Sequence, residues 1–401
     1  MRPLDGVRVL DLSQMWAAPG CAMYLADQGA DVVKVEPLAG DDARYTFSAP
    51  PIRDGQSRAY LVVGRNKRGM ALDLRTAAGQ DVIHRLVPHF DVVVVNFRPG
   101  ASARLRVDYD GLRRLNPRLI YAQITAYGWR GPYADRSGYD LVFQALNGIL
   151  SRRRMPDGTP IPAAVWVADC SAPMILAYGV ALALLMRERT GEGQQVDTSL
   201  LMAALAMQSV DAVRVPATEE NDGRDYSRQA MYAPYQCQDG AWIIVVIIQN
   251  QQWVRLCQAL DLEHLAADPR FDAPLKRARE SDTLYELLTA MFETRPRAEW
   301  LSILMGHDVP VAPVLQREEI FDHEQFRANG MFVEVDDPWA GPTTMLAAPV
   351  RLSAAEPPIY RPAPQLGQHT HEILREAGFG DDEIEQLRRQ GVINEPAFPL
   401  S

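Results

Sequence analysis

The strongest constraint on this fold is an alternation of β-branched runs with helical segments through the first 200 residues. Apolar runs typical of buried strands occupy residues 7–10, 31–35, 91–96, 119–125 and 195–197. Helical patterns lie between them, at 19–28, 78–86, 141–150 and 171–189. Continuous apolar strands separated by helices predict βαβ units and a mostly parallel sheet. We therefore expect a Rossmann-like, doubly wound α/β domain.

The pattern changes near residue 216, which predicts a second domain. A chain of 401 residues is long enough for two hydrophobic cores. Residues 217–227 are polar and charged, as linkers are. A strand pattern at 242–249, with helical patterns at 252–260, 282–293 and 298–305, predicts a small α+β domain. Residues 333–349 are β-rich with turns, and residues 372–390 form a helical stretch.

Charge and cysteine content indicate where such a chain works. The 51 acidic and 41 basic residues give a net charge of −10, which argues against nucleic acid as a partner. Four scattered cysteines without a C-x-x-C pair favour reduced thiols and a cytoplasmic location. The first residues carry no apolar signal segment, and the apolar run 172–186 is too short to span a membrane.

Several well-known catalytic and binding motifs are absent from the sequence. G-x-S-x-G, H-E-x-x-H and G-x-G-x-x-G do not occur. His369 and His371 stand two apart at an expected helix start, which fits a solvated turn better than a metal site. We expect no metal.

Asp169 is the most informative carboxylate, because it lies between an apolar stretch and a very apolar helix. One interpretation is a helix N-cap. The other is a nucleophile held in a partly dry pocket. The two are compatible, since a helix N-terminus orients a carboxylate and keeps it ionised.

Basic residues gather near predicted strand ends: Asn66-Lys67-Arg68, Arg75, Arg98 and Arg104. They fit a solvated loop surface and a phosphate-binding site about equally. The phosphate site is an option because arginine binds phosphate with two parallel hydrogen bonds. Residues 96–100 close a strand, where open α/β sheets place their ligands.

A set of segments, in order, carries a resemblance to a known family. They are 3–13 (PLDGVRVLDLS), 17–20 (AAPG), 29–37 (GADVVKVEP), 66–68 (NKR), 96–100 (NFRPG), 115–121 (LNPRLIY), 138–140 (GYD), Asp169, 187–194 (RERTGEGQ) and 367–370 (GQHT). Together they resemble the class III CoA-transferase family of CaiB/BaiF type, which includes formyl-CoA:oxalate and carnitine CoA-transferases. The resemblance covers nearly the whole chain.

The resemblance implies a Rossmann-like large domain from both chain ends (residues 1–215 and 331–401), a small domain (216–330) and an interlocked homodimer. It implies acyl-CoA and a carboxylic acid as substrates, with coenzyme A as the only cofactor and no membrane partner. Asp169 matches the family's catalytic aspartate. Tyr139 and Asp140 match the substrate pocket. The positions matching coenzyme A contacts are Met15, Trp16, Ala17, Leu72, Asp73, Leu74, Arg75, Asn96, Phe97, Arg98 and Arg104.

The implied chemistry passes through a mixed anhydride and an aspartyl-CoA thioester on Asp169. Backbone N–H groups near Ala17 and Ala18, or near Asn250, are expected to stabilise the oxyanions. Residues 248–253 contain no glycine, so either any lid works differently from the glycine-rich loop of some relatives or the substrates differ. Trp16 stands where some relatives have a small or polar residue, and Pro37 where oxalate-using relatives have arginine. These two changes argue against formyl-CoA:oxalate exchange.

Two other functions remain open. A 2-methylacyl-CoA racemase would use a Gly-His-Asp motif, but this chain has Gly138-Tyr139-Asp140. A tyrosine with a pKa near 10 is a poor base at neutral pH. A non-catalytic CoA-binding protein is the other alternative. Trapping an acyl-enzyme with hydroxylamine would indicate a transferase, and deuterium exchange at the α-carbon a racemase.

Overall fold

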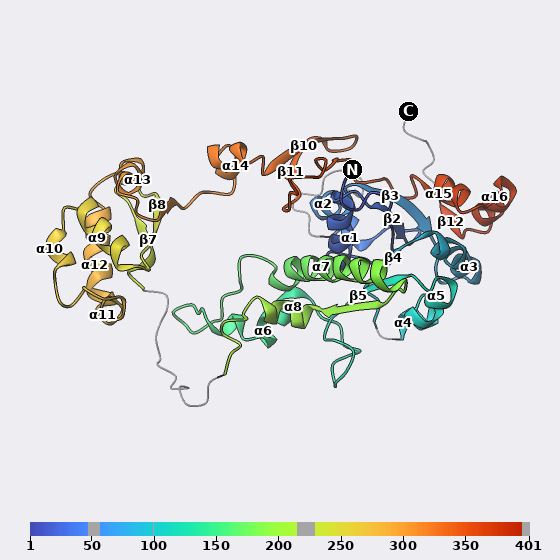
Figure 1. Ribbon diagram of the computed structural model, residues 1–401, viewed down its shortest axis with the longest axis horizontal. Coiled ribbons are helices and arrows are strands. Elements are labelled where there is room, and N and C mark those ends of the chain that lie inside the picture. Colours follow the sequence, from blue (N-terminus) through green and yellow to red (C-terminus); the bar gives the residue numbers. More distant parts are fainter. Residues whose placement is uncertain (47–56, 99, 215–228, 395–401) are drawn as a thin grey trace. The chain divides into compact units, whose positions relative to one another are not determined.

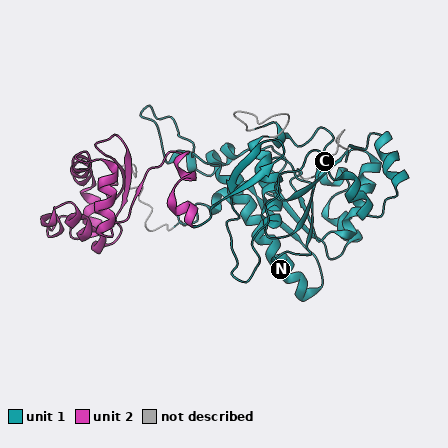
Figure 2. Cartoon of the chain, turned by 90° about the horizontal axis from the view of Figure 1, so that it is seen from above, with its two compact units in different colours: residues 1–214, 329–401 teal, residues 215–328 magenta. Residues whose placement is uncertain are grey.

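The computed structural model describes residues 1–46, 57–98, 100–214 and 229–394. The chain divides into two compact units, residues 1–214 with 329–401 and residues 215–328, which Figure 2 colours separately. The sequence placed the corresponding limits at 216 and 330. The linker predicted at 217–227 lies outside the described residues.

The large unit is built on a seven-stranded sheet in the order β12-β3-β2-β1-β4-β5-β6 (Figure 1). Six strands run parallel: β1 (Arg8–Asp11), β2 (Asp31–Glu36), β3 (Lys67–Leu72), β4 (Val92–Val95), β5 (Ile120–Thr125) and β6 (Gln195–Ser199). A short edge strand, β12 (Ile393–Asn394), pairs antiparallel with β3. The order 3-2-1-4-5-6 is that of doubly wound sheets, so the predicted α/β class is confirmed.

Alternate residues of the buried strands face opposite sides of the sheet, as the two-residue strand period requires. Val92 and Val94 pack with α1 (Ala17–Asp27), α7 (Val167–Thr190) and α8 (Leu200–Ala206). Val93 and Val95 join the opposite core. Its helices are α3 (Ala77–Leu86), α5 (Tyr109–Leu115), α15 (Thr370–Glu376) and α16 (Asp381–Arg389). The shorter helices of this unit are α2 (Arg58–Gly64), α4 (Ala101–Arg104) and α6 (Asp140–Leu146).

Strand β3 corrects the sequence interpretation of residues 66–68 as a basic loop. Lys67 is buried, and its Nζ donates to Asp11 Oδ2 and to the Pro19 carbonyl, both at 2.8 Å. Arg68 pairs with Asp31, Glu372 and Glu376 at 2.7–2.8 Å. Because acidic partners neutralise both cations, neither belongs to a phosphate-binding site.

The small unit has its own core and is an α+β structure. Three antiparallel strands, β7 (Tyr232–Gln236), β8 (Trp242–Val246) and β9 (Val311–Pro313), form its sheet. Six helices accompany them among the described residues: α9 (Asn250–Ala259), α10 (Glu263–Ala266), α11 (Pro274–Arg279), α12 (Ser281–Phe292), α13 (Arg297–Gly306) and α14 (Glu324–Ala328). Trp253, Phe292 and Trp300 fill the core.

The C-terminal segment belongs to the large unit and begins with a hairpin of β10 (Phe332–Asp337) and β11 (Gly341–Leu346). The sequence predicted one helical stretch over 372–390, but the structure has two helices, α15 and α16. Gly378, with a φ of +81°, ends α15 in the left-handed region, and Gly380 then caps α16.

Helix α7 is the longest of the described helices, and by length and composition alone it could cross a membrane. Its 24 residues exceed the run 172–186 considered from the sequence, so length does not argue against a span. One side of α7 packs on the sheet, α1 and α8, as core helices of globular proteins do.

Candidate active site

A pocket opens where the strand order of the sheet reverses, between the carboxyl ends of β1 and β4. Open α/β sheets bind ligands at this point. The pocket measures about 200 Å³ and is lined by the loops after β1, β4 and β5 and by the first turn of α7. The residues predicted from the sequence that line it are Met15, Trp16, Ala17, Asn96, Phe97, Arg98, Tyr139 and Asp169.

Asp169 lies in the first turn of α7, because the helix begins at Val167 rather than at the expected Ser171. Asp169 is therefore not the N-cap. The Asp140 side chain caps the N-terminus of α7 instead. Its Oδ1 accepts from the backbone N–H groups of Ala168 (2.6 Å) and Asp169 (3.2 Å). Gln144, one turn along α6, donates to the other Asp140 oxygen at 2.5 Å. Asp140 is buried behind the pocket rather than lining it.

The Asp169 carboxylate is half-buried and has no hydrogen-bond donor within the described part of the chain. Burial, and then the negative charge of Asp140, raise its pKa to about 6. An ionised carboxylate that nothing solvates well is a reactive nucleophile. The N-terminus of α1 lies at the same pocket, through Ala17, and its dipole favours negative charge there.

The raised pKa predicts that the Asp169 carboxylate lowers the free energy of unfolding when it is ionised. Well below the ordinary pKa of 3.8 the side chain is protonated in both the folded and unfolded protein, so no penalty exists. Between that value and the folded-state pKa of about 6 the unfolded protein loses its proton while the folded protein keeps it, so the penalty grows with pH and is complete above pH 6. Asp169→Asn should raise the free energy of unfolding by about 1 kcal/mol at pH 8, after allowance for partial exposure. Denaturant melts at pH 4 and pH 8 check this, and equal variant effects at both values would contradict it.

The loop between β1 and α1 is fixed to the sheet at three successive residues. Lys34 Nζ donates to the Ser13 carbonyl. The Asn96 amide pairs with both Gln14 N–H (3.0 Å) and Gln14 C=O (2.7 Å). Asp41 accepts from Met15 N–H at 2.9 Å. These anchors hold Met15 at a φ of +69°, a conformation that is unfavourable for a side chain of this size.

Several residues of the pocket were not identified from the sequence, and the polar ones are Gln14, Thr125, Arg136 and Ser137. Ser137 accepts from Arg98 at 2.5 Å, and the Arg136 guanidinium lies 4.1 Å from the Tyr133 ring centre. Residues 127–139 gave only a signal of irregular structure. The signal that could have found Arg136 and Ser137 was their position directly before Gly138-Tyr139-Asp140. The Trp16 and Trp166 rings meet edge to face, 5.8 Å apart.

Other predicted contacts lie away from this pocket. Leu72 is buried in β3, and Arg75 pairs with Asp73 on the surface at 2.8 Å. Leu74 packs against the core of α3 and α5, and Arg104 ends α4. None of the four residues 72–75, nor Arg104, lines the pocket. Asn250 belongs to the small unit, where its amide bonds to Asp272 and Arg277.

No group of three or more His, Cys, Asp or Glu side chains with metal-binding geometry occurs among the described residues. The pocket brings the Asp169 carboxylate together with Arg98 and Arg136, a set that can support acyl transfer.

Comparisons with known proteins identify the family of this chain. The family model of CoA-transferase family III matches residues 4–370. Succinyl-CoA:glutarate CoA-transferase from Mus musculus is 33% identical over 98% of this chain and 91% of that protein. Succinyl-CoA–D-citramalate CoA-transferase from Chloroflexus aurantiacus is 33% identical over 98% of both chains. The crystal structure of a CaiB/BaiF family protein from Brucella suis matches with a TM-score of 0.79 and 32% identity, over 94% of this chain and 99% of that one. The chain therefore belongs to CoA-transferase family III.

Proposed function

We propose that this protein moves coenzyme A from an acyl-CoA to a carboxylic acid, with Asp169 as the covalent acyl carrier. The observation that carries the proposal is an ionisable carboxylate without hydrogen-bond donors among the described residues, at the mouth of a pocket at the strand-order reversal. Coenzyme A is the only cofactor the proposal needs, because one thioester is exchanged for another of similar energy.

The proposed reaction has four covalent steps. An Asp169 oxygen attacks the thioester carbonyl, the C–S bond breaks, and CoA departs as the thiolate. A mixed anhydride of Asp169 and the donor acid remains. The thiolate then attacks the aspartyl carbonyl, and the donor acid departs. The acceptor carboxylate attacks the carbonyl of this aspartyl-CoA thioester, the C–S bond breaks again, and a second anhydride forms as CoA thiolate departs. CoA thiolate finally attacks the acceptor carbonyl, which releases the new thioester and the Asp169 carboxylate.

The pocket also suggests the class of acid. Arg98 and Arg136 line it along with Asp169 and supply positive charge next to the reaction centre. Guanidinium groups bind carboxylates in a bidentate manner. The names of the two relatives above include succinyl-CoA, a thioester with a second carboxylate. We propose that the substrates include dicarboxylic acids, whose distal carboxylate one of these arginines binds.

A screen of acyl-CoA donors against carboxylate acceptors, read by mass spectrometry, tests the function. Succinyl-CoA with C5 and C6 dicarboxylates should yield new thioesters, and monocarboxylate acceptors should react more slowly. The same samples in deuterated water report racemase chemistry. Deuterium at the α-carbon without acyl exchange would contradict the transferase function. The absence of both signals would indicate a CoA-binding protein without catalytic activity.

The pKa of Asp169 predicts the acid limb of the pH profile. Only the ionised carboxylate attacks, and burial with Asp140 raises the pKa to about 6. kcat/KM should therefore be nearly constant above pH 7 and fall about tenfold per pH unit well below pH 6. Asp140→Asn removes the nearby negative charge and should move this limb to lower pH. A limb that stays in place in this variant would show that Asp169 does not control it.

Asp41 should act as a positioning residue for the loop that carries Met15 and Trp16. Its carboxylate holds Met15 N–H and pairs with Lys34 at 3.0 Å, and both side chains are buried. Asp41→Ala releases the strained Met15 backbone, and we expect kcat/KM to fall by about 10–100-fold. Asp42→Ala, the exposed neighbour, is the matched control. Wild-type kcat and KM in a folded Asp41→Ala protein would contradict the assignment.

We also propose an interlocked homodimer in the cytoplasm. Helix α7 presents an apolar stripe at helical spacing, formed by Met174, Tyr178, Leu182, Leu185 and Met186, each at least 43% exposed. Large exposed apolar stripes mark interaction surfaces. The four cysteines are unpaired, which fits a reducing compartment. Sedimentation velocity distinguishes a dimer from a monomer of 44.7 kDa.

A further inference from the structure

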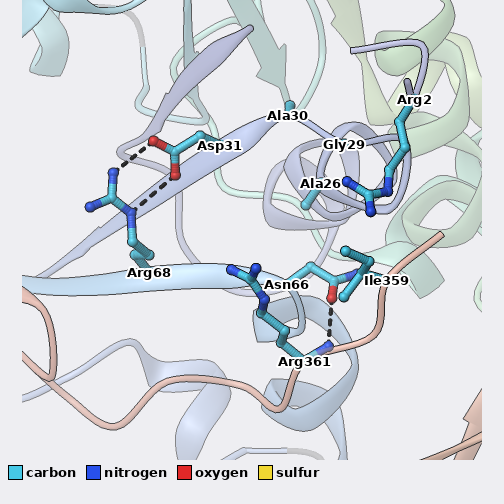
Figure 3. Close-up of a pocket in the computed structure, with 9 residues that line it drawn as sticks. All are labelled: Arg2, Ala26, Gly29, Ala30, Asp31, Asn66, Arg68, Ile359 and Arg361. Carbon is cyan, nitrogen blue, oxygen red and sulfur yellow. Dashed lines mark hydrogen bonds and ion pairs between the residues drawn. The ribbon is translucent and has the colours of Figure 1, made fainter. Parts of the chain in front are cut away.

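One hydrogen-bond network of the large unit leads to the nucleophile, and it passes through Gln144 of α6. Figure 3 shows a contact of another kind, away from the Asp169 pocket: the Asn66 side chain accepts from Arg361 N–H at 2.7 Å and ties the start of β3 to the C-terminal segment. Gln144 does not line the pocket either. We propose that Gln144 is a positioning residue for CoA transfer, which fixes Asp169 at the pocket through Asp140. This inference rests on the function proposed above.

Helix α7, which carries the nucleophile, has no cap of its own. The first N–H groups of a helix have no acceptor within the helix. The N-cap residue is Trp166, and an indole cannot accept from them. The Asp140 carboxylate accepts from two of these groups instead, Ala168 N–H at 2.6 Å and Asp169 N–H at 3.2 Å. The start of α7, and with it the backbone of the nucleophile, is therefore fixed by a side chain of α6.

Gln144 fixes the orientation of the Asp140 carboxylate. Its Nε2 donates to Asp140 Oδ2 at 2.5 Å, which leaves Oδ1 for the N–H groups of α7. The two side chains are only 2% and 5% exposed. Because water does not reach this contact, nothing replaces the donor when it is removed.

The same amide also holds the chain that enters α7. Its Oε1 accepts from Ala163 N–H at 2.9 Å, and its Nε2 donates to the Val165 carbonyl at 3.3 Å. With an acceptor needed on one side and a donor on the other, only one orientation of the amide satisfies all three contacts. Gln144 therefore holds both the segment before the helix and the carboxylate that caps it.

The position of Asp169 depends on this backbone support. Its own carboxylate receives no hydrogen bond from the described residues, so no donor among them holds the side chain directly. Misplacement of a reacting group by about 1 Å can lower a rate about 10²-fold. Loss of the Gln144 contacts should therefore lower kcat, whereas coenzyme A binding should persist because the residues that line the pocket are unchanged.

Gln144→Met removes all three hydrogen bonds and keeps the length of the side chain. At pH 8 we expect kcat for CoA transfer to fall about 10–100-fold, while the Kd of coenzyme A, from calorimetry, changes less than about threefold. Amide hydrogen exchange at the first turn of α7 should become faster, because Asp140 protects two of its N–H groups. Gln195→Met is the matched control: Gln195 also donates to an aspartate, Asp197, at 2.9 Å, but that carboxylate is exposed and lies outside the pocket.

An exchange of donor and acceptor separates positioning from a general loss of stability. Asp140→Asn alone should lower kcat, because its oxygen still accepts from α7 and its amide N–H then faces the Gln144 N–H. Adding Gln144→Glu provides an acceptor for that amide and still accepts from Ala163 N–H. The double variant should therefore recover kcat at least about tenfold relative to Asp140→Asn.

Three results would overturn the assignment. They are wild-type kcat in a folded Gln144→Met protein, an equal change in kcat and in the Kd of coenzyme A, and a double variant no more active than Asp140→Asn. If Gln144→Met does not fold, the double variant alone decides. The wild-type enzyme in the same assay keeps the two proposals apart. CoA transfer by the wild type leaves the proposed function intact whatever the variants do, and its absence would contradict the function itself.

Discussion

Asp169→Ala is expected to lower CoA transfer by a factor of at least about 10³ while leaving the fold intact. In the proposed mechanism the variant removes the carboxylate that carries the acyl group, so the proposed covalent path is lost, whereas substrate binding elsewhere in the pocket persists. The side chain is half-buried and receives no hydrogen bond to its carboxylate from the described residues, so its loss leaves no buried partner unsatisfied. Steady-state kcat with succinyl-CoA and a dicarboxylate measures the effect.

Two controls define this result. Asp157→Ala, an exposed carboxylate in the loop before α7, should keep wild-type turnover. Circular dichroism and denaturant melts should show Asp169→Ala as folded and no less stable than the wild type at pH 8, because its ionised carboxylate opposes folding there. Undiminished turnover in a clean Asp169→Ala preparation would remove the proposed mechanism.

Lys67→Met should destabilise the protein by about 3–5 kcal/mol. Lys67 and Asp11 form a pair at 2.8 Å with both side chains buried, so removing the cation leaves a buried Asp11 carboxylate without its ion-pair partner. Asp11 also accepts hydrogen bonds from Ser13, in the loop that continues to Trp16, so the pocket geometry should change too. Urea denaturation gives the free-energy change.

The chain supplies a matched control for this pair. Arg75 and Asp73 also lie 2.8 Å apart, but the Arg75 side chain is 84% exposed. Arg75→Met should change stability by less than about 1 kcal/mol, since exposed ion pairs contribute little. The double variant Lys67→Met with Asp11→Asn should recover part of the loss, because the buried charge is gone. Equal effects of Lys67→Met and Arg75→Met would contradict the role of burial.

The parallel sheet could be predicted because its strands are apolar on both faces. Val92–Val95 shows this most directly, with alternate valines in opposite cores. Strand β3 escaped prediction because its first two residues are Lys67 and Arg68, and only tertiary partners make such residues acceptable in a sheet. A single sequence does not reveal Asp11 beside Lys67, because 56 residues separate them.

The presence of Asp169 in the pocket could be predicted from the sequence, but much of its surroundings could not. Asp169 stood out by its apolar context, yet its place on the helix was wrong by several residues. The helix starts at Val167 because Asp140, 28 residues earlier, satisfies the N–H groups of its first turn. Arg136 and Ser137 come from a loop whose sequence carries no periodicity, so only the folded chain brings them to the pocket.

Oxygen transfer into the Asp169 side chain is the most direct test of covalent carriage. The enzyme is cycled with succinyl-CoA and an acceptor acid labelled with ¹⁸O in its carboxylates, quenched and digested for mass spectrometry. When Asp169 leaves the second anhydride, it retains one acceptor oxygen, so the peptide that contains Asp169 should gain ¹⁸O while the peptides with Asp140 and Asp157 do not. Complete turnover with no ¹⁸O at Asp169 would contradict the account.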